Sequence, residues 1–239
     1  MNFEAGEILY FDKPLHWTSF NLVAKVRSAL CHKVGVRKLK VGHAGTLDPL
    51  ATGVVTICTG KATKRIDELQ AYTKEYIATL QLGATTPSFD LETAVDATYP
   101  TAHITEQKTR EVLTHFLGKI EQVPPAFSAC KVDGHRAYDL ARKGKDVQLK
   151  AKILVIDEIE LQNFNSETMQ MTIRVVCSKG TYIRALARDI GEALQSGAHL
   201  IALRRTRVGD IKVEDCMKMD DFPEWLENQK IEKETESDN

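Results

Sequence analysis

Hydrophobic positions recur along this chain with two periods, and each period predicts one kind of element. A period of two residues predicts strands, and it is clearest over Tyr72–Leu82, where four alternate residues beginning with Tyr76 share one face. Spacings of three and four residues predict helices. The expected strands are Ile8–Phe11, Val54–Cys58, Tyr72–Leu82, Ile153–Asn163, Met169–Cys177 and 199–208. The expected helices are one beginning after Thr18 or Ser19, then Lys61–Gln70, Lys108–Leu117, a short one at Ala137–Arg142, and one from Ile183 to Leu194.

These elements predict one substantial domain with an excursion and a tail. The 239 residues, 43% of them hydrophobic, suffice for a single domain, which we expect to span residues 1–213. After Pro124-Pro125 the stretch 126–152 is rich in basic and small residues, which predicts an insertion rather than a second domain. Residues 214–239 are acidic and lack an apolar period beyond about residue 225, so we expect a partly disordered tail.

The net charge of −1 hides an uneven distribution. Residues 214–239 hold ten acids and three lysines, a net charge of −7, which leaves +6 for residues 1–213. A basic body gives weak support for a polyanionic partner such as nucleic acid. The five cysteines include no C-x-x-C pair, so we expect reduced thiols without a disulfide framework or a zinc site.

The hydropathy of the chain also bears on its location. No apolar stretch approaches the ~20 residues that are needed to cross a bilayer. The N-terminus begins with an acidic segment and lacks the pattern of a signal peptide. We therefore expect a cytoplasmic protein that does not contact a membrane.

The run from Gly42 to Gly53 carries the strongest chemical signal in the chain. It reads Gly-His-Ala-Gly-Thr-Leu-Asp-Pro-Leu-Ala-Thr-Gly and holds a single carboxylate, that of Asp48. Glycine permits tight backbone turns, and Pro49 favours an extended conformation at Asp48, so the run predicts a rigid loop that presents one acid. A lone carboxylate suits a nucleophile better than a metal cage. The alternative is a simple Asp-Pro turn without a chemical role.

The full run resembles the signature of the TruB-type pseudouridine synthases, which isomerise uridine 55 in the T-arm of tRNA, and it meets every fixed position of that signature. Further resemblances follow in family order over residues 6–213, at Lys13-Pro14 with Thr18-Ser19, Gly60–Lys64, Lys74-x-Tyr76, Lys179–Arg184 and Leu203-Arg204-Arg205. The resemblance implies an α+β fold in which a mixed, largely antiparallel sheet is flanked by helices. It also implies that residues 126–152 form a thumb-like insertion that grips RNA.

The same resemblance implies which residues act on the uridine. Asp48 would be the nucleophile, at C1′ of the sugar or at C6 of the base, and Arg184 would be its partner. Tyr76 would stack on the uracil, and its hydroxyl would assist deprotonation at C5. Tyr182 and Leu203 would close the pocket. An isomerisation of this kind needs neither a metal nor a cofactor, and the sequence contains no phosphate-binding glycine motif.

Recognition of the RNA is the second implication of the resemblance. The target uridine lies within folded RNA and would be flipped out to reach Asp48, while His43 fills the vacated space or contacts the displaced nucleotides. The cations expected at the RNA backbone are Lys13, Lys64, Arg204 and Arg205. The expected partner is the T-arm stem-loop of tRNA, bound by a monomer that requires no protein partner.

The chain departs from the family pattern in two respects. His16 stands where the family usually has glycine, and only residues 214–239 follow the core, so we expect no RNA-binding domain of the PUA type. Asp90 matches an acidic position of the family, but its role is not evident from the sequence. Two rival interpretations are an RNA-folding chaperone on the same scaffold and a metal-dependent nuclease, although the sequence offers no clustered metal ligands.

Overall fold

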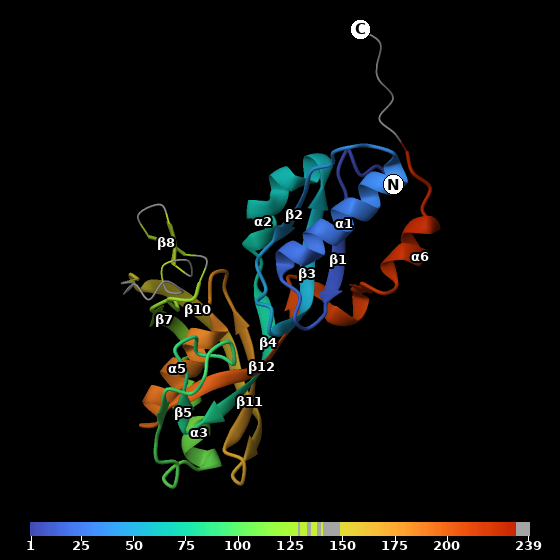
Figure 1. The fold of residues 1–239 in the computed structure, drawn as a ribbon. Coiled ribbons are helices and arrows are strands. Elements are labelled where there is room, and N and C mark those ends of the chain that lie inside the picture. The colour runs from blue at the N-terminus through green and yellow to red at the C-terminus, as the bar shows by residue number, and fades with distance from the viewer. Residues whose placement is uncertain (129, 133–134, 138–139, 141–148, 233–239) are drawn as a thin grey trace. The chain divides into compact units, whose positions relative to one another are not determined.

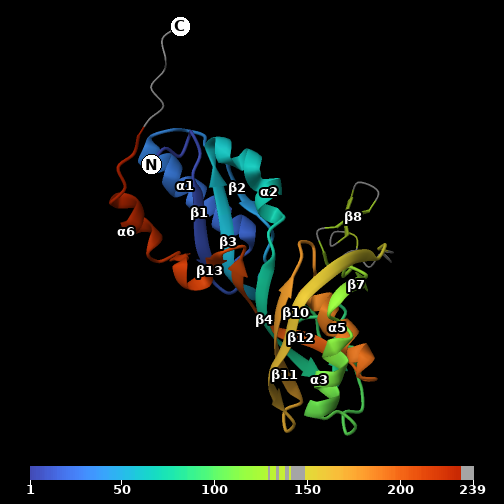
Figure 2. The ribbon, with the colours of Figure 1, turned by 180° about the vertical axis from the view of Figure 1, so that it is seen from behind.

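The structure, a computed structural model, describes residues 1–128, 130–132, 135–137, 140 and 149–232 (Figures 1 and 2). The chain forms two compact units. Unit 1 comprises Met1–Lys74 and Arg204–Asn239, and unit 2 comprises Glu75–Leu203. The single domain expected over residues 1–213 is thus divided, and the middle of the chain forms a unit of its own.

The sheet of unit 1 is built around β3 (Ala51–Thr59), which is antiparallel to β1 (Ile8–Lys13) with Phe11 opposite Val55. β2 (Val41–Ala44) is antiparallel to β3, and β12 (Ala198–Val208) also pairs with β3. β12 turns back into the short strand β13 (Ile211–Lys212). All residues of β3 except one are buried, as the apolar run of the sequence predicts.

Two helical segments lie alongside these strands (Figure 1). Thr18 caps α1 (Ser19–Val34) through a capping box with Asn21, and Gly35 ends the helix in the left-handed conformation. The expected helix Lys61–Gln70 is instead a 3₁₀ helix, η1 (Gly60–Arg65), followed by α2 (Ile66–Gln70). The Thr63 hydroxyl donates a hydrogen bond to the Gly60 carbonyl at 2.7 Å, which favours the tighter turn.

The described part of the acidic C-terminal segment, as far as residue 232, belongs to unit 1. It forms η2 (Val213–Asp215), β14 (Met217–Lys218) and α6 (Phe222–Glu227), and β14 is parallel to β1. Phe222 is 1% exposed and meets Phe11 edge to face, with ring centroids 5.3 Å apart. The acidic stretch is thus packed onto β1 through the ring of Phe222.

Unit 2 consists of strands with helices packed against them. Strands β4 (Lys74–Leu82), β11 (Gln170–Cys177), β10 (Lys152–Asn165) and β7 (Gly118–Gln122) follow one another in the sheet. Helix α3 (Glu106–Thr114) packs against β10 and against α5 (Ile183–Ala193). The short pair β5 (Ala84–Thr85) and β6 (Ala97–Thr98) completes the unit. The strict alternation of buried residues along β4 confirms the face predicted for Tyr76.

Within the insertion at 126–152 the structure shows a two-stranded hairpin, β8 (Lys131–Val132) with β9 (His135–Arg136). Most of the short helix expected at Ala137–Arg142 lies outside the described residues. Among the described residues, none of the helices combines the length and the hydrophobicity that would be required to span a bilayer. The sheet of mixed but largely antiparallel strands with flanking helices confirms the predicted fold class.

Candidate functional site

Asp48 lies in unit 1, on the loop that joins β2 to β3. Its carbonyl accepts a hydrogen bond from the Ala51 amide at 3.0 Å, which closes a turn ahead of the strand. The residue is half-buried, whereas its neighbour Leu47 is 3% exposed and Pro49 is exposed. The loop is thus anchored by Leu47, and Asp48 keeps part of its surface in solvent.

The first residue of α1 and the segment before it hold both chain neighbours of Asp48. The Ser19 hydroxyl accepts a hydrogen bond from the Leu47 amide at 2.9 Å and donates one to the Leu47 carbonyl at 3.1 Å. The His16 amide donates to the Pro49 carbonyl at 2.8 Å. Because main-chain groups on either side of Asp48 have fixed partners, the direction of the Asp48 backbone is determined by the fold.

Arg205 supports the same loop from β12. Its side chain is buried, and its guanidinium donates to the Val54 carbonyl at 2.7 Å, to the Thr46 carbonyl at 3.3 Å and to the Gly45 carbonyl at 3.2 Å. Gly53 permits this approach, because a Cβ atom there would stand 2.1 Å from the Arg205 carbonyl oxygen. The sequence predicts that Arg205 contacts the RNA backbone. In the structure Arg205 is 2% exposed and its guanidinium donates hydrogen bonds to three main-chain carbonyls, so it positions the loop instead.

Lys13 is the second cation that the structure places inside unit 1. It is fully buried, and its ammonium donates to the Pro14 carbonyl at 2.9 Å and to the Trp17 carbonyl at 2.6 Å. Burial lowers the pKa of Lys13 to about 8, and the negative charge of Asp48 opposes that shift. The prediction that Lys13 contacts the RNA backbone therefore needs correction, since its ammonium lies within the electrostatic reach of Asp48 and not at the surface.

His43 lies on β2, five residues before Asp48. Burial lowers its pKa from the usual 6.5, so the imidazole is neutral at pH 7. A hydrogen bond with the Gly45 backbone opposes this lowering of the pKa. Within the described part of the chain, its Nδ1 atom is buried and has no hydrogen-bond partner. A buried ring nitrogen without a partner calls for an explanation, such as a water molecule or a ligand.

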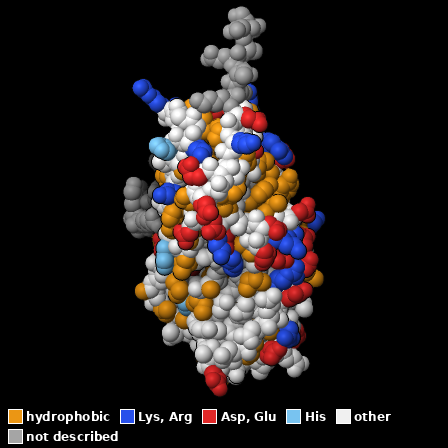
Figure 3. Space-filling view, turned by 90° about the vertical axis from the view of Figure 1, so that its right-hand side faces the viewer, with side chains coloured by type: hydrophobic (Ala, Val, Ile, Leu, Met, Phe, Trp, Pro, Cys, Tyr) orange, Lys and Arg blue, Asp and Glu red, His pale blue; other side chains and the backbone are white. Residues whose placement is uncertain are grey.

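The other two cations predicted at the RNA backbone are more accessible. Lys64, in η1, is exposed. Arg204 has a side chain that is 41% exposed and pairs with both oxygens of Asp12, at 3.1 and 2.8 Å. On the face drawn in Figure 3, basic and acidic side chains are interspersed, without one large basic field. Phosphate contacts must therefore be assigned residue by residue, and Lys64 fits that role best.

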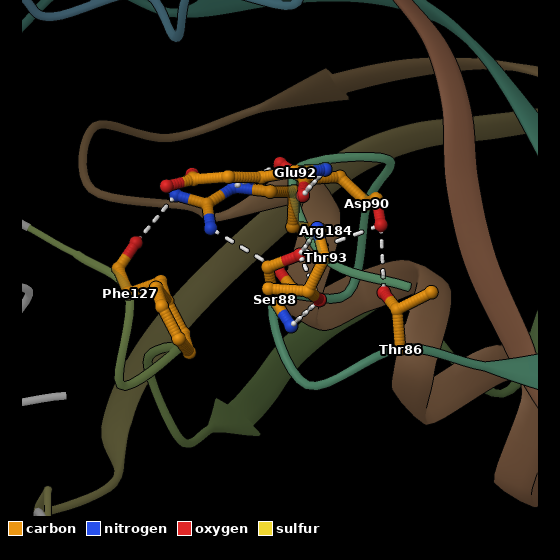
Figure 4. Close-up of polar contacts among 7 residues, drawn as sticks. All are labelled: Thr86, Ser88, Asp90, Glu92, Thr93, Phe127 and Arg184. Carbon is orange, nitrogen blue, oxygen red and sulfur yellow. Dashed lines mark hydrogen bonds and ion pairs between the residues drawn. The ribbon is translucent and has the colours of Figure 1, made fainter. Parts of the chain in front are cut away.

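In unit 2, Arg184 is the centre of a buried polar cluster (Figure 4). It lies in the first turn of α5, is 5% exposed, and forms an ion pair from Nε to Oδ2 of Asp90 at 3.6 Å. Its two terminal nitrogens donate to the Ser88 carbonyl at 3.2 Å and to the Phe127 carbonyl at 2.9 Å. The position of the guanidinium is therefore set by the 86–93 loop on one side and by Phe127 on the other.

Asp90 is itself held tightly within that loop. Its second carboxylate oxygen accepts a hydrogen bond from the Glu92 amide at 2.9 Å, and its carbonyl accepts one from the Thr86 hydroxyl at 2.7 Å. With 5% of its surface exposed, Asp90 is committed to internal contacts. The structure thus gives the acidic family position a role that the sequence alone does not reveal, as the ionic partner of Arg184.

The remaining predicted residues also lie in unit 2. Tyr76, on β4, is 7% exposed, and Leu203 is half-buried on β12. Tyr182 precedes α5, its amide bonds to the side chain of Gln122 at 2.9 Å, and its hydroxyl lies 3.3 Å from the Cys130 sulfur. Burial and the contact with Cys130 raise the pKa of Tyr182, so its hydroxyl stays protonated at neutral pH.

The structure therefore groups the predicted residues into two sets. Unit 1 brings Asp48 together with Lys13 and Arg205, and unit 2 joins Arg184 to the Asp90 loop. The partnership of Asp48 with Arg184 remains a prediction. Among the described residues, no group of three or more His, Cys, Asp or Glu side chains is arranged to hold a metal ion.

Comparisons with known proteins point to one family. A family profile described as TruB family pseudouridylate synthase, N-terminal domain, matches residues 32–183, and one described as tRNA pseudouridylate synthase B, C-terminal domain, matches residues 184–237. A protein of Phocaeicola vulgatus named tRNA pseudouridine synthase B is 71% identical over 97% of this chain and 98% of its own length. One of the same name from Flavobacterium johnsoniae is 51% identical, over 93% of this chain and 96% of its own.

A solved structure shows the same fold. The crystal structure of a Cbf5–Nop10–Gar1 complex contains a chain that is 29% identical, with a TM-score of 0.70 over 94% of this chain. The present chain spans 55% of that longer chain. These matches confirm both the fold and the family resemblance that the sequence motifs predict.

Proposed function

Because the chain belongs to the TruB family of pseudouridylate synthases, we propose that it converts uridine 55 in the T-arm of tRNA into pseudouridine, with Asp48 as the nucleophile. The name shared by relatives that match nearly the full chain supports tRNA as the substrate. In this isomerisation the C1′–N1 bond breaks and a C1′–C5 bond forms. The proton on C5 is lost and N1 gains one, so atoms and electrons balance without a co-reactant.

The observation that carries the proposal is the way in which unit 1 presents Asp48. Main-chain groups of both its neighbours are hydrogen-bonded to the first residue of α1 and the segment before it, while the residue itself stays half-buried. The buried ammonium of Lys13 lies within the electrostatic reach of Asp48. A carboxylate on a fixed backbone that keeps access to solvent is what attack at C1′ of the sugar or at C6 of the base requires.

The residues of unit 2 supply the other groups of the proposed reaction. Arg184 orients and balances the charge of Asp48, and Tyr76 stacks on the uracil. Tyr182, which stays protonated at neutral pH, lines the pocket together with Leu203 and can donate a hydrogen bond to a uracil carbonyl. The fixed guanidinium of Arg184 supports this assignment, because a preorganised cation needs no rearrangement during the reaction.

Uridine 55 is stacked within the folded T-arm, so it must be extruded before it can reach Asp48. We assign His43 to the RNA that surrounds the extruded nucleotide. Its neutral imidazole, with Nδ1 lacking a partner in the described part of the chain, has hydrogen-bonding capacity to offer to a base. Lys64 is assigned to the phosphate backbone.

The proposal is tested with the purified chain alone, without added metal, cofactor or protein partner. An unmodified tRNA transcript carrying tritium at C5 of its uridines should release one tritium per molecule, because only the isomerised uridine loses its C5 hydrogen. A transcript with cytidine at position 55 should release none. Release that is independent of position 55 would contradict the proposed site, and an absence of release would contradict the proposed reaction.

The same assay separates the enzyme from an RNA-folding chaperone. Asp48→Asn removes the charge and keeps the shape of the side chain. We expect the variant to bind tRNA with unchanged affinity while tritium release is lost. A chaperone whose catalysis is incidental would instead keep its effect on tRNA folding, measured by the fraction of transcript that can be aminoacylated, in both forms of the chain.

A further inference from the structure

Exposed apolar side chains occur over residues 15–20, where the segment after β1 leads into the first turn of α1; we call this stretch the 15–20 turn. Phe20 is 68% exposed and Leu15 is 48% exposed, and Trp17 between them is partly exposed. Single apolar side chains on a surface need no explanation, but three of them within six residues form a patch that water solvates poorly. Aromatic residues in such a patch are typical of a surface that receives a partner.

The 15–20 turn is fastened to both residues that flank Asp48. His16 donates its amide to the Pro49 carbonyl, and Ser19 makes two hydrogen bonds with the main chain of Leu47. The Trp17 carbonyl accepts from the buried ammonium of Lys13. The 15–20 turn is therefore fixed against the loop that carries Asp48.

His16 shapes this turn. Its φ angle of 67° lies in the left-handed region, where a residue other than glycine is strained. The strain is offset by the hydrogen bond from the His16 amide to Pro49, which ties the turn to the Asp48 loop. The first turn of α1 contains no acidic residue, so no carboxylate there repels an approaching phosphate.

We propose that Leu15, Trp17 and Phe20 form a stacking surface for unpaired bases of the substrate RNA, next to the extruded uridine. This inference rests on the proposed function. When one nucleotide leaves a base stack, its neighbours expose apolar faces, and aromatic side chains replace the lost stacking without regard to sequence. The hydrogen bonds to the two residues that flank Asp48 keep these side chains on the segment next to the Asp48 loop.

Fluorescence gives a direct test, because the chain contains only two tryptophans, Trp17 and Trp225. In a Trp225→Phe variant, Trp17 is the sole tryptophan. Titration with unmodified T-arm stem-loop RNA should quench its emission in parallel with binding measured on a filter. Unchanged emission at saturating RNA would overturn the inference. Quenching without any tritium release would sustain the stacking surface and contradict the proposed reaction, so the two failures are distinguishable.

Kinetics supply a second test with a matched control. Phe20→Ala should raise KM for tRNA about tenfold and leave kcat within about twofold, since a stacked base is lost but the Asp48 loop is retained. Leu15→Ala should raise KM by a smaller factor. Leu117→Ala removes a similarly exposed leucine (55%) from unit 2 and should change neither constant. A wild-type chain that dimerises in sedimentation, and a Phe20→Ala chain that does not, would show a contact between copies and overturn the inference.

Discussion

Two loops of this protein carry an aspartate, and the two residues differ in burial and in how the fold holds them. In unit 1 the fold fixes the main chain around Asp48 through Ser19 and Arg205 and leaves the residue half-buried. In unit 2 the carboxylate of Asp90 pairs with Arg184 and accepts a hydrogen bond from the Glu92 amide, with 5% of its surface exposed. The difference in exposure is what favours Asp48 as the proposed nucleophile and Asp90 as a positioning residue.

The largest effect on stability should come from the backbone support of Asp48. Arg205→Met leaves the carbonyls of Gly45, Thr46 and Val54 without their donor inside unit 1. An unsatisfied buried polar group costs about 1–3 kcal/mol, so we expect a loss of about 4 kcal/mol in the free energy of unfolding. Urea denaturation measures it.

The neighbouring arginine provides the control. Arg204→Met removes a half-exposed cation paired with Asp12 and should cost less than about 1 kcal/mol. Equal losses for the two variants would show that the carbonyl contacts of Arg205 do not hold the Asp48 loop.

The next effect concerns Asp90, the buried acid of unit 2. Asp90→Asn leaves the buried guanidinium of Arg184 without this ionic partner, which should cost about 3 kcal/mol in unfolding free energy. Because Arg184 is then positioned less firmly, kcat should fall more than KM rises. Asp96→Asn, at an exposed position on the same segment, should change neither stability nor kcat appreciably. If kcat were unchanged in Asp90→Asn, Asp90 would have no role in positioning Arg184 for the reaction.

A smaller effect is expected at the hydroxyl that holds Leu47. Ser19→Ala removes one donor and one acceptor from a buried main-chain pair and should cost about 1–2 kcal/mol. Thr18→Ala, which removes the N-cap of the same helix, should cost a similar ~1 kcal/mol. Only Ser19→Ala should also lower kcat, since Thr18 does not touch the Asp48 loop in any hydrogen bond that the structure shows for it. If Ser19→Ala and Thr18→Ala lowered kcat by the same factor, both losses would be due to the stability of α1 alone.

The last effect is the pH dependence contributed by Lys13, which appears only above about pH 8. Its pKa is about 8 in the folded chain against 10.5 for an ordinary lysine, so between these values the unfolded chain binds a proton that the folded chain has released. The free energy of unfolding should therefore gain an upward slope from about pH 8 to 10.5. In urea denaturation at several pH values, Lys13→Met should lack that part of the slope. Equal pH slopes for the variant and the parent chain would contradict the lowered pKa of Lys13.

Much of this structure could be predicted from local sequence patterns. The alternation along β4, the cap at Thr18 and the loop around Asp48 follow from residues that are close in sequence. The roles of Lys13 and Arg205 could not be predicted, because a basic residue is usually exposed and their burial depends on partners brought together by the fold. Arg205 meets Gly45 across 160 positions of sequence, and no local pattern reports such a contact.

The division into two units escaped prediction for the same reason. β12 is one continuous strand, and the sequence along it gives no sign that Leu203 ends one unit and Arg204 begins the other. The elements of the acidic C-terminal segment were also not evident from composition, because the contact between Phe222 and Phe11 joins positions far apart in the sequence. Long-range packing, which composition does not encode, decides both features.

The most direct test is the single-turnover rate of tritium release from tRNA by Asp48→Asn, measured beside Asp90→Asn. We predict that Asp48→Asn retains the unfolding midpoint and the RNA affinity of the parent chain but reacts at least about a thousandfold more slowly. Asp90→Asn should be less stable and only partly slowed. An Asp48→Asn rate close to that of the parent chain would show that the half-buried carboxylate of unit 1 is not the group that reacts.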